Sequence, residues 1–205
     1  CIFFPNLKEA AAQVGNLVEA SFYIKSNHGG GCALAHPPLV DGPCLFAPLT
    51  ARPLADQYRL CPLDEGELTE ECFKRTPLPF GSHEQVVRFK DREERFNGTF
   101  VSEGVTPPGH EWAMNPIPMC GTPTTHTSDP SGNVHTCPGG TPPVPAFPYP
   151  APGVENITSF VIVDTLRIPL GIKPGKYVLG WRWDAEQTTQ VWGACADIEI
   201  VARSA

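Results

Sequence analysis

Histidine side chains are the first candidates for chemistry, because a neutral imidazole binds metals and exchanges protons near neutral pH. His28 stands between a predicted strand and the three glycines of 29–31. There it is either a metal ligand or a solvent-exposed turn residue. The remaining histidines lie in polar or Pro/Gly-rich segments and are expected at the surface: His36, His83, His110, His126 and His135. No Cys/His cluster has the spacing of a zinc site.

Asp184 and Glu186 can be read as the acid pair of a glycoside hydrolase. The plainer interpretation is that these carboxylates cap a turn or pair with Arg182. No serine stands in a Gly-x-Ser-x-Gly setting, so the sequence gives nucleophilic catalysis no support. Hydrolysis is therefore disfavoured.

The eight cysteines are dispersed, and none belongs to a CxxC pair. An even number of dispersed cysteines in a loop-rich chain favours disulfides and an oxidising compartment. We predict Cys61–Cys72 first and Cys120–Cys137 next, with Cys32–Cys44 as a further candidate. The partners of Cys1 and Cys195 stay open.

Two N-x-[ST] acceptors, at Asn97 and Asn156, agree with secretion. The chain opens at Cys1 without a signal peptide, so we expect a removed leader or an internal cut. A net charge of −7 disfavours nucleic acid as a partner, and no apolar run is long enough to span a membrane. We therefore expect an extracellular glycoprotein at the cell wall or cell surface.

Short strands must position these residues, because 24 prolines and 19 glycines disfavour long helices. Strand patterns cover 18–25, 86–89, 98–101, 159–164, 177–184 and 195–201, and 68–73 resembles one helical turn capped by Thr69. In 177–184 the aromatic and leucine side chains share one face, so Trp181 and Trp183 are expected in the core. Trp192 is expected there too, although one of the three tryptophans could instead form an exposed platform for sugar stacking.

The pattern predicts an all-β, antiparallel sandwich of immunoglobulin-like or fibronectin-III-like type, with under about 15% helix. We expect one domain over 1–205. Within it, 32–56 is predicted to be a loop insertion and 107–152 a Pro-rich irregular surface excursion.

Several motifs stand in an order that resembles the lytic polysaccharide monooxygenases, and more closely the secreted monooxygenase-like proteins of algae, diatoms and oomycetes (chitin-binding type-4-like). They are the segments 27–31 (NHGGG), 58–62 (YRLCP), 68–73 (LTEECF), 102–104 (SEG), 115–118 (NPIP), 174–187 (PGKYVLGWRWDAEQ) and 190–198 (QVWGACADI). The matches extend over roughly 18–201.

The resemblance implies a copper site in which an N-terminal His and a second His supply three nitrogens, with a Tyr on the axial side. His28 matches the second His, Trp192 stands at the axial position, and Cys1 stands where the chain opens. Ala185 replaces a cysteine that is common in the family and would pair with Cys195. We therefore expect no cofactor and no tight binding of Cu(II) by the chain as it stands.

Three functions follow as hypotheses. The first is a non-catalytic extracellular structural or glycan-associated glycoprotein that contacts polysaccharide or other glycoproteins and could self-assemble. The second is a copper-dependent polysaccharide monooxygenase whose N-terminal His lies upstream, and the third is a carbohydrate-binding module. Copper titration separates the second hypothesis from the others, and glycan pull-down separates the third from the first.

Overall fold

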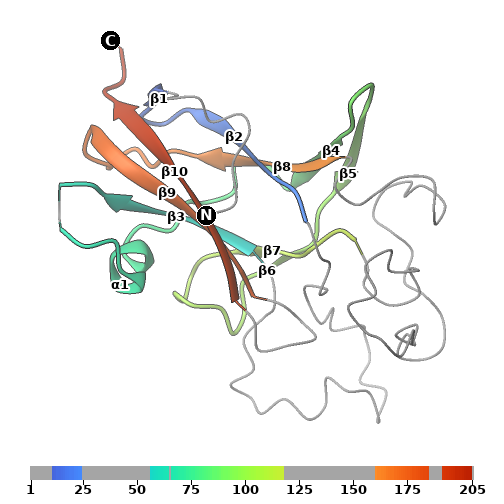
Figure 1. The fold of residues 1–205 in the computed structure, drawn as a ribbon, viewed down its shortest axis with the longest axis horizontal. Helices are drawn as coiled ribbons and strands as arrows, with labels where there is room; N and C mark the ends of the chain where they lie inside the picture. The colour runs from blue at the N-terminus through green and yellow to red at the C-terminus, as the bar shows by residue number, and fades with distance from the viewer. Residues whose placement is uncertain (1–10, 25–55, 65, 118–159, 185–190, 205) are drawn as a thin grey trace.

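The computed structural model describes residues 11–24, 56–64, 66–117, 160–184 and 191–204, which form two β-sheets and one short helix (Figure 1). The six-stranded sheet has the order β1 (Ala11–Gln13), β10 (Val191–Val201), β9 (Gly175–Asp184), β3 (Asp56–Pro62), β7 (Trp112–Ala113) and β6 (Phe100–Val101). The four-stranded sheet has the order β2 (Leu17–Phe22), β8 (Val161–Arg167), β4 (Glu84–Arg88) and β5 (Glu93–Asn97). The predicted all-β class is confirmed.

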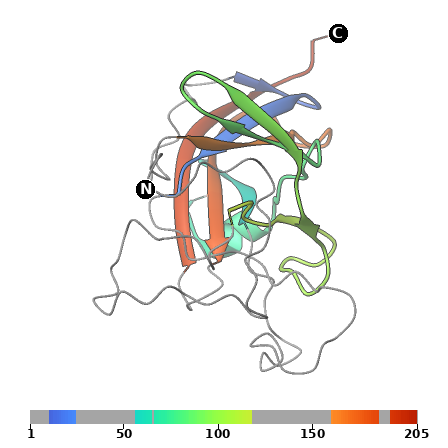
Figure 2. The same cartoon turned by 90° about the vertical axis from the view of Figure 1, so that its right-hand side faces the viewer.

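The β9–β10 hairpin is the longest paired unit, with a register that runs from Asp184 opposite Val191 to Gly175 opposite Ile200. Tyr177, Leu179, Trp181 and Trp183 are all buried, as their alternation predicts. Figure 2 shows the curved β9 and β10 strands at the left of the molecule and the β4–β5 hairpin across its top.

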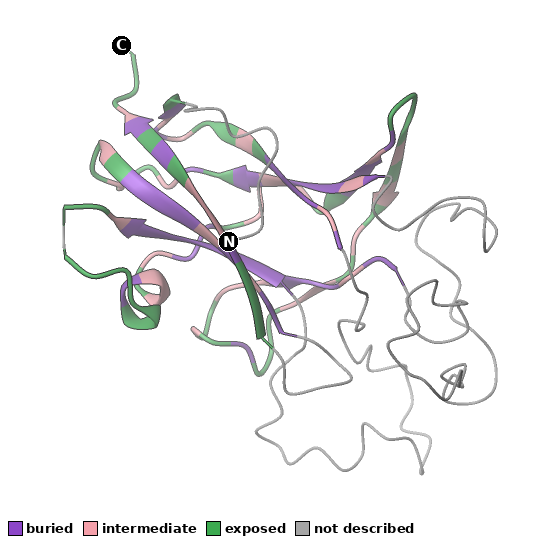
Figure 3. Ribbon diagram, in the orientation of Figure 1, coloured by how far each residue is buried: buried purple, intermediate pink, exposed green. Residues whose placement is uncertain are grey.

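The core lies between the two sheets and takes side chains from both. Tyr58, Leu60 and Leu179 come from the six-stranded sheet, while Ile162 and Leu166 come from the four-stranded one. Figure 3 shows this burial along the middle of β3, β8 and β9, with exposed residues gathered at the tip of the β4–β5 hairpin. The described strands thus form a β-sandwich-like arrangement.

The six-stranded sheet is mixed, which departs from the expected antiparallel pattern. β1 pairs with β10 in parallel, with Ala11 opposite Glu199. Gly15, at φ 84°, turns the chain from β1 in one sheet to β2 in the other. An Ala-Ala-Gln strand has no β-branched residue, so its sequence gave no strand signal. The immunoglobulin-like type stays a prediction.

The surface excursion predicted for 107–152 is wrong for its first part. Trp112 and Ala113 form β7, and Trp112, Ala113, Met114 and Ile117 are all buried. Their apolar side chains pack although prolines surround them, because burial of an aromatic ring outweighs local turn propensity. The part of 107–152 beyond 117 lies outside the described residues, as does the predicted insertion up to 55; residue 56 already begins β3.

The predicted helical turn is confirmed as α1 (Glu70–Lys74), the one helix among the described residues. The Thr69 hydroxyl accepts a hydrogen bond from the Cys72 amide at 3.2 Å, which satisfies a donor at the helix start. The described part of the chain contains no helix that is long and apolar enough to cross a bilayer.

Candidate functional site

At one end of the sandwich, several strands begin or end next to segments that lie outside the described residues. Asp56 at the start of β3 lies opposite Trp183 of β9 in the strand register. Trp192 at the start of β10 lies opposite the same residue from the other side. Asp56 also pairs with Ala113 of β7. We call this end, defined by Asp56, Ala113, Trp183 and Trp192, the tryptophan end.

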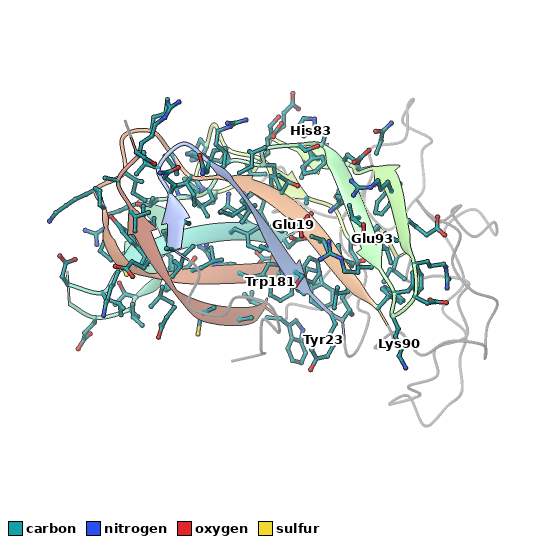
Figure 4. The ribbon with its side chains drawn as sticks, turned by 90° about the horizontal axis from the view of Figure 1, so that it is seen from above. Glu19, Tyr23, His83, Lys90, Glu93 and Trp181 are labelled. Atoms are coloured by element: carbon teal, nitrogen blue, oxygen red, sulfur yellow. A yellow bond between two sulfur atoms is a disulfide. The ribbon has the colours of Figure 1, made fainter. Side chains whose placement is uncertain are left out.

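Aromatic rings fill the tryptophan end. The rings of Phe22 and Trp181 lie 4.8 Å apart across the two sheets, and the Trp181 ring lies 6.2 Å from that of Trp183. Figure 4 shows Trp181 beside β2, with Tyr23 just past the end of that strand. Trp181 and Trp183 are each 4% exposed, as predicted, whereas Trp192 is 36% exposed, which corrects its expected place in the core. Trp192 is the second residue of β10.

A buried acidic cluster lies just inside the tryptophan end. Asp164 of β8 accepts hydrogen bonds from the Tyr58 hydroxyl and the Gln85 side-chain amide, both at 2.8 Å. Asp56 accepts one from the Trp181 indole at 3.2 Å. Both carboxyl groups are 1% exposed, and no described basic side chain forms an ion pair with either. The two acids are therefore stabilised by neutral donors alone.

Burial sets the protonation of this acidic cluster. It raises the pKa of Asp164 to about 6, although the hydrogen bonds from Gln85 and Tyr58 oppose the shift. Burial, together with the nearby Asp164 carboxylate, raises the pKa of Asp56 well above its ordinary value. The two carboxyl groups lie close enough that the charge on one disfavours ionisation of the other.

A second charged network lies on the outer side of the six-stranded sheet, against α1. Glu70 accepts hydrogen bonds from Arg59 at 2.7 Å and from Arg182 at 2.5 Å. Partial burial alone would raise the pKa of Glu70, but the hydrogen bonds and charges of these two arginines prevail and lower it. Arg182 also donates two hydrogen bonds to the Asp184 carboxylate, at 2.6 and 3.0 Å.

The predicted pairing of Asp184 with Arg182 is thereby confirmed. Both oxygens of the Asp184 carboxylate are engaged in this two-point contact with the guanidinium. Glu186 lies outside the described residues. The acid pair of a hydrolase thus gains no support from Asp184.

The proposed copper ligand His28 lies outside the described residues, as do His36, His126 and His135. His83 is exposed, stacks on Phe100 with ring centroids 4.4 Å apart, and lies 3.1 Å from the Glu111 carboxylate. No group of three His, Cys, Asp or Glu side chains suited to a metal occurs in the part of the chain that the structure describes.

The described side chains at the tryptophan end do not fit copper. Trp192, at the axial position, carries no phenolic oxygen, and the carboxylate of Asp56 is turned to the Trp181 indole. Copper sites of the implied kind need imidazole and amine nitrogens. We therefore derive no chemical step through a metal.

The predicted disulfide Cys61–Cys72 is confirmed, with Cα atoms 5.4 Å apart. Cys195 lies half-buried in β10. Asn97 is exposed at the end of β5, an edge strand, as an acceptor for a glycan must be. The remaining predicted positions, which lie outside the described residues, are Cys1, Cys32, Cys44, Cys120, Cys137 and Asn156.

Comparison with known proteins gives little. No family model matches the sequence, and no curated protein matches it. Among solved structures, a family 123 glycoside hydrolase from Clostridium perfringens, studied for glycolipid glycan hydrolysis, aligns with a TM-score of 0.33 and 7% identity. The alignment covers 94% of this chain but 22% of that enzyme, so this chain spans about a fifth of its length. A likeness this distant says nothing of activity.

Sequence reasoning missed the buried acidic cluster. The signal was present at Asp164, a charged residue directly after the apolar residues 161–163 within a predicted strand. An acid in such a run is either at a strand end or buried with partners. Its partners Tyr58 and Gln85 stand 106 and 79 positions away in the sequence, so no local pattern could identify them.

Proposed function

We propose that this protein is a secreted, non-catalytic glycoprotein on a monooxygenase-like scaffold, and that it acts as an extracellular structural or glycan-associated protein. The observation that carries this proposal is the exposed indole of Trp192 at the tryptophan end. Trp181 and Trp183 are each 4% exposed, whereas Trp192 is 36% exposed. That position is the one that the resemblance assigns to the axial residue.

An exposed indole suits glycan binding because it joins a broad apolar face to a polar edge. The apolar C–H face of a sugar ring covers such a surface without leaving a buried polar group unpaired. Trp181 and Trp183 are buried, with ring centroids 6.2 Å apart, and their packing supports the neighbouring end of β10 as a rigid base. A rigid support lowers the entropy lost on binding.

Replacement of the exposed indole tests this function. We expect Trp192→Ala to weaken binding to insoluble chitin or cellulose by about tenfold, since anchor tryptophans often contribute more than 1 kcal/mol. Trp192→Phe should retain part of the affinity. Pull-down with the purified full chain measures the effect.

Leu170→Ala serves as the matched control, because Leu170 is 72% exposed and lies in the turn between β8 and β9. It should bind as the parent does. Equal binding by the parent and Trp192→Ala would contradict a role for the tryptophan end.

The glycoprotein part of the proposal rests on Asn97. The exposed Asn97 and Thr99 flank Gly98, whose amide is hydrogen-bonded to the His83 carbonyl at 2.8 Å. We expect Asn97→Gln, expressed through a secretory pathway, to lose the mass of one glycan. Thr99→Ala should lose the same mass and Thr99→Ser should keep it, because the acceptor triplet requires Ser or Thr. Four intact masses that differ only by the masses of the replaced residues would contradict glycosylation at this site.

A further inference from the structure

A pocket of about 490 Å³ lies at the end of the sandwich away from the tryptophan end. Pro62 at the end of β3, Arg75 and Thr76 after α1, and residues of the turn between β8 and β9 line it. Its volume falls in the range of small-molecule sites. We call it the turn pocket, and no motif of the sequence pointed to it.

The walls of the turn pocket are fixed by bonds that do not depend on a ligand. The disulfide between Cys61 and Cys72 ties the strand before Pro62 to α1. The Tyr177 hydroxyl donates to the Lys173 carbonyl at 2.7 Å, which holds the turn in place. The Leu60 amide donates to the Thr76 carbonyl at 2.8 Å. A preformed pocket loses little entropy when it binds a ligand.

The charged residues that line the turn pocket, among those described, are both basic. Arg75 is exposed, and so is the Lys173 side chain, at 83%. Asp64 lies 4.0 Å from Lys173, but both side chains are mostly in water, where such a pair contributes little. In a chain of net charge −7, two cations facing one pocket favour an anionic ligand.

The other walls are apolar and stiff. Pro62, Pro169 and Ile172 present carbon surface, with the ring of Tyr177 beside them. A small inorganic anion would leave this surface uncovered. A sugar ring that carries a carboxylate or a sulfate matches both features, because its C–H face covers the prolines while its anionic group meets the cations.

We propose that the turn pocket binds an anionic sugar unit, a uronate or a sugar sulfate, of an extracellular polysaccharide. Arg75 and Lys173 bind the anionic group through charge-assisted hydrogen bonds, and Pro62 and Ile172 contact the ring. The proposal rests on the proposed glycan association and names its ligand class and a second contact surface. It does not require Trp192.

Calorimetric titration of the purified full chain with a short oligogalacturonate tests this site. The methyl-esterified oligomer is the matched neutral ligand, and a sulfated dextran oligosaccharide distinguishes sulfate from carboxylate. We expect the charged oligomers to bind at least about tenfold more tightly than the ester, and added salt to weaken them. Arg75→Ala combined with Lys173→Ala should lower that affinity by about tenfold or more.

Two control variants keep the result interpretable. Arg75→Lys with Lys173→Arg retains both charges and should retain most of the binding, which separates loss of charge from misfolding. Lys90→Ala removes an exposed cation from the β4–β5 turn, which lies near the start of β8 (Figure 4). The turn pocket lies past the opposite end of β8. It should bind as the parent does.

Tight binding of either charged oligomer that the alanine pair abolishes would support the turn pocket. Charged-oligomer binding unchanged by the alanine pair would overturn it. Binding of neutral polysaccharide alone, lost in Trp192→Ala, would overturn the turn pocket and leave the proposed function standing. Binding of no saccharide, charged or neutral, would overturn both.

Discussion

Asp164→Asn is expected to make the protein more stable at neutral pH, by about 2–3 kcal/mol. Asp164 is buried among neutral donors, and burial raises its pKa from an ordinary value near 3.8 to about 6. Each pKa unit corresponds to about 1.4 kcal/mol, so ionising this carboxyl in the folded state costs about 3 kcal/mol relative to the unfolded chain. An asparagine of the same shape avoids that cost.

The asparagine can keep both partners of the carboxylate. The Gln85 side-chain oxygen is buried and makes no hydrogen bond to any described residue. A flipped Gln85 amide would accept from the new Asn amide, while the Asn oxygen still accepts from Tyr58. The number of side-chain hydrogen bonds is therefore unchanged, and the replacement adds no unpaired buried group to the one that Gln85 already has.

The same carboxyl sets the sign of the pH dependence. The folded pKa lies above the unfolded value, so the contribution of Asp164 to stability is complete below about pH 3.9 and is lost as the pH rises through about 6. The raised pKa of Asp56 acts in the same direction. We expect the free energy of unfolding to increase as the pH falls from about 7 to about 5.

Exposed acids limit that gain at lower pH. The pKa of Glu70 is lowered in the folded state, so its contribution is present above its unfolded pKa, about 4.3, and is lost as the pH falls further. Maximum stability is therefore expected near pH 5, roughly. Guanidinium unfolding of the parent and Asp164→Asn across this range measures both effects.

Tyr58→Phe is the contrasting variant, because it removes the hydroxyl that donates to Asp164 at 2.8 Å. It should destabilise the protein by about 1–3 kcal/mol at neutral pH, and by less at about pH 5, where the carboxyl is protonated. An Asp164→Asn variant that is less stable than the parent at neutral pH and equally pH-dependent would contradict this account of the buried acidic cluster.

Strong periodicity made the central hairpin predictable. In β9 the inward side chains are large and apolar at every second position, so a single register buries them all. In β10 the alternation of Asp197 and Glu199 with Ile198 and Ile200 identified the outer face in the same way. These elements have strand character in their own residues, before any partner is considered.

β5 had no such character, and sequence reasoning missed it. Its residues 93–97 include three charged side chains, which have weak strand propensity. Cross-strand ion pairs stabilise it instead: Arg88 pairs with Glu93, and Arg95 pairs with Glu84 at 2.9 Å. A pattern that depends on the neighbouring strand becomes visible only when the pairing is known.

The candidate sites divide in the same way, into features that the local sequence predicts and features that only the fold brings together. The disulfide was predictable because a short separation and a helical turn bring Cys61 and Cys72 together locally. The exposure of Trp192 was not predictable, because it depends on how the end of β10 is placed relative to the rest of the fold. The turn pocket combines residues from 62 to 177, so only the folded chain brings Arg75 and Lys173 to one cavity.

Removal of the Cys61–Cys72 disulfide is expected to lower the free energy of unfolding by about 3 kcal/mol. The bond joins residues 11 positions apart, and a cross-link of this span removes about that much loop entropy from the unfolded chain. The variant to measure is Cys61→Ala combined with Cys72→Ala, since a single replacement leaves a reactive thiol. Both positions are buried, so the two lost sulfur atoms add a smaller packing cost.

Two other contacts should keep α1 partly in place in the double variant. Glu70 still accepts from Arg59 and Arg182, and the Phe73 ring still lies against Gly180, where an added Cβ would approach the ring to 2.8 Å. We therefore expect faster amide exchange in α1 and little change in the β9–β10 hairpin, which does not depend on the disulfide. Adding Gly180→Ala should displace Phe73 and extend the loss of protection through α1.

Reductant provides the decisive comparison for the disulfide. Under reducing conditions the parent should unfold at a denaturant concentration close to that of the double variant, and the variant should respond to reductant less than the parent does, since it lacks this disulfide. A parent whose stability is the same with and without reductant, despite complete reduction shown by thiol labelling of the unfolded chain, would contradict the expected contribution. In that case the arginine–Glu70 contacts and the Phe73–Gly180 packing alone would fix α1 on the sheet.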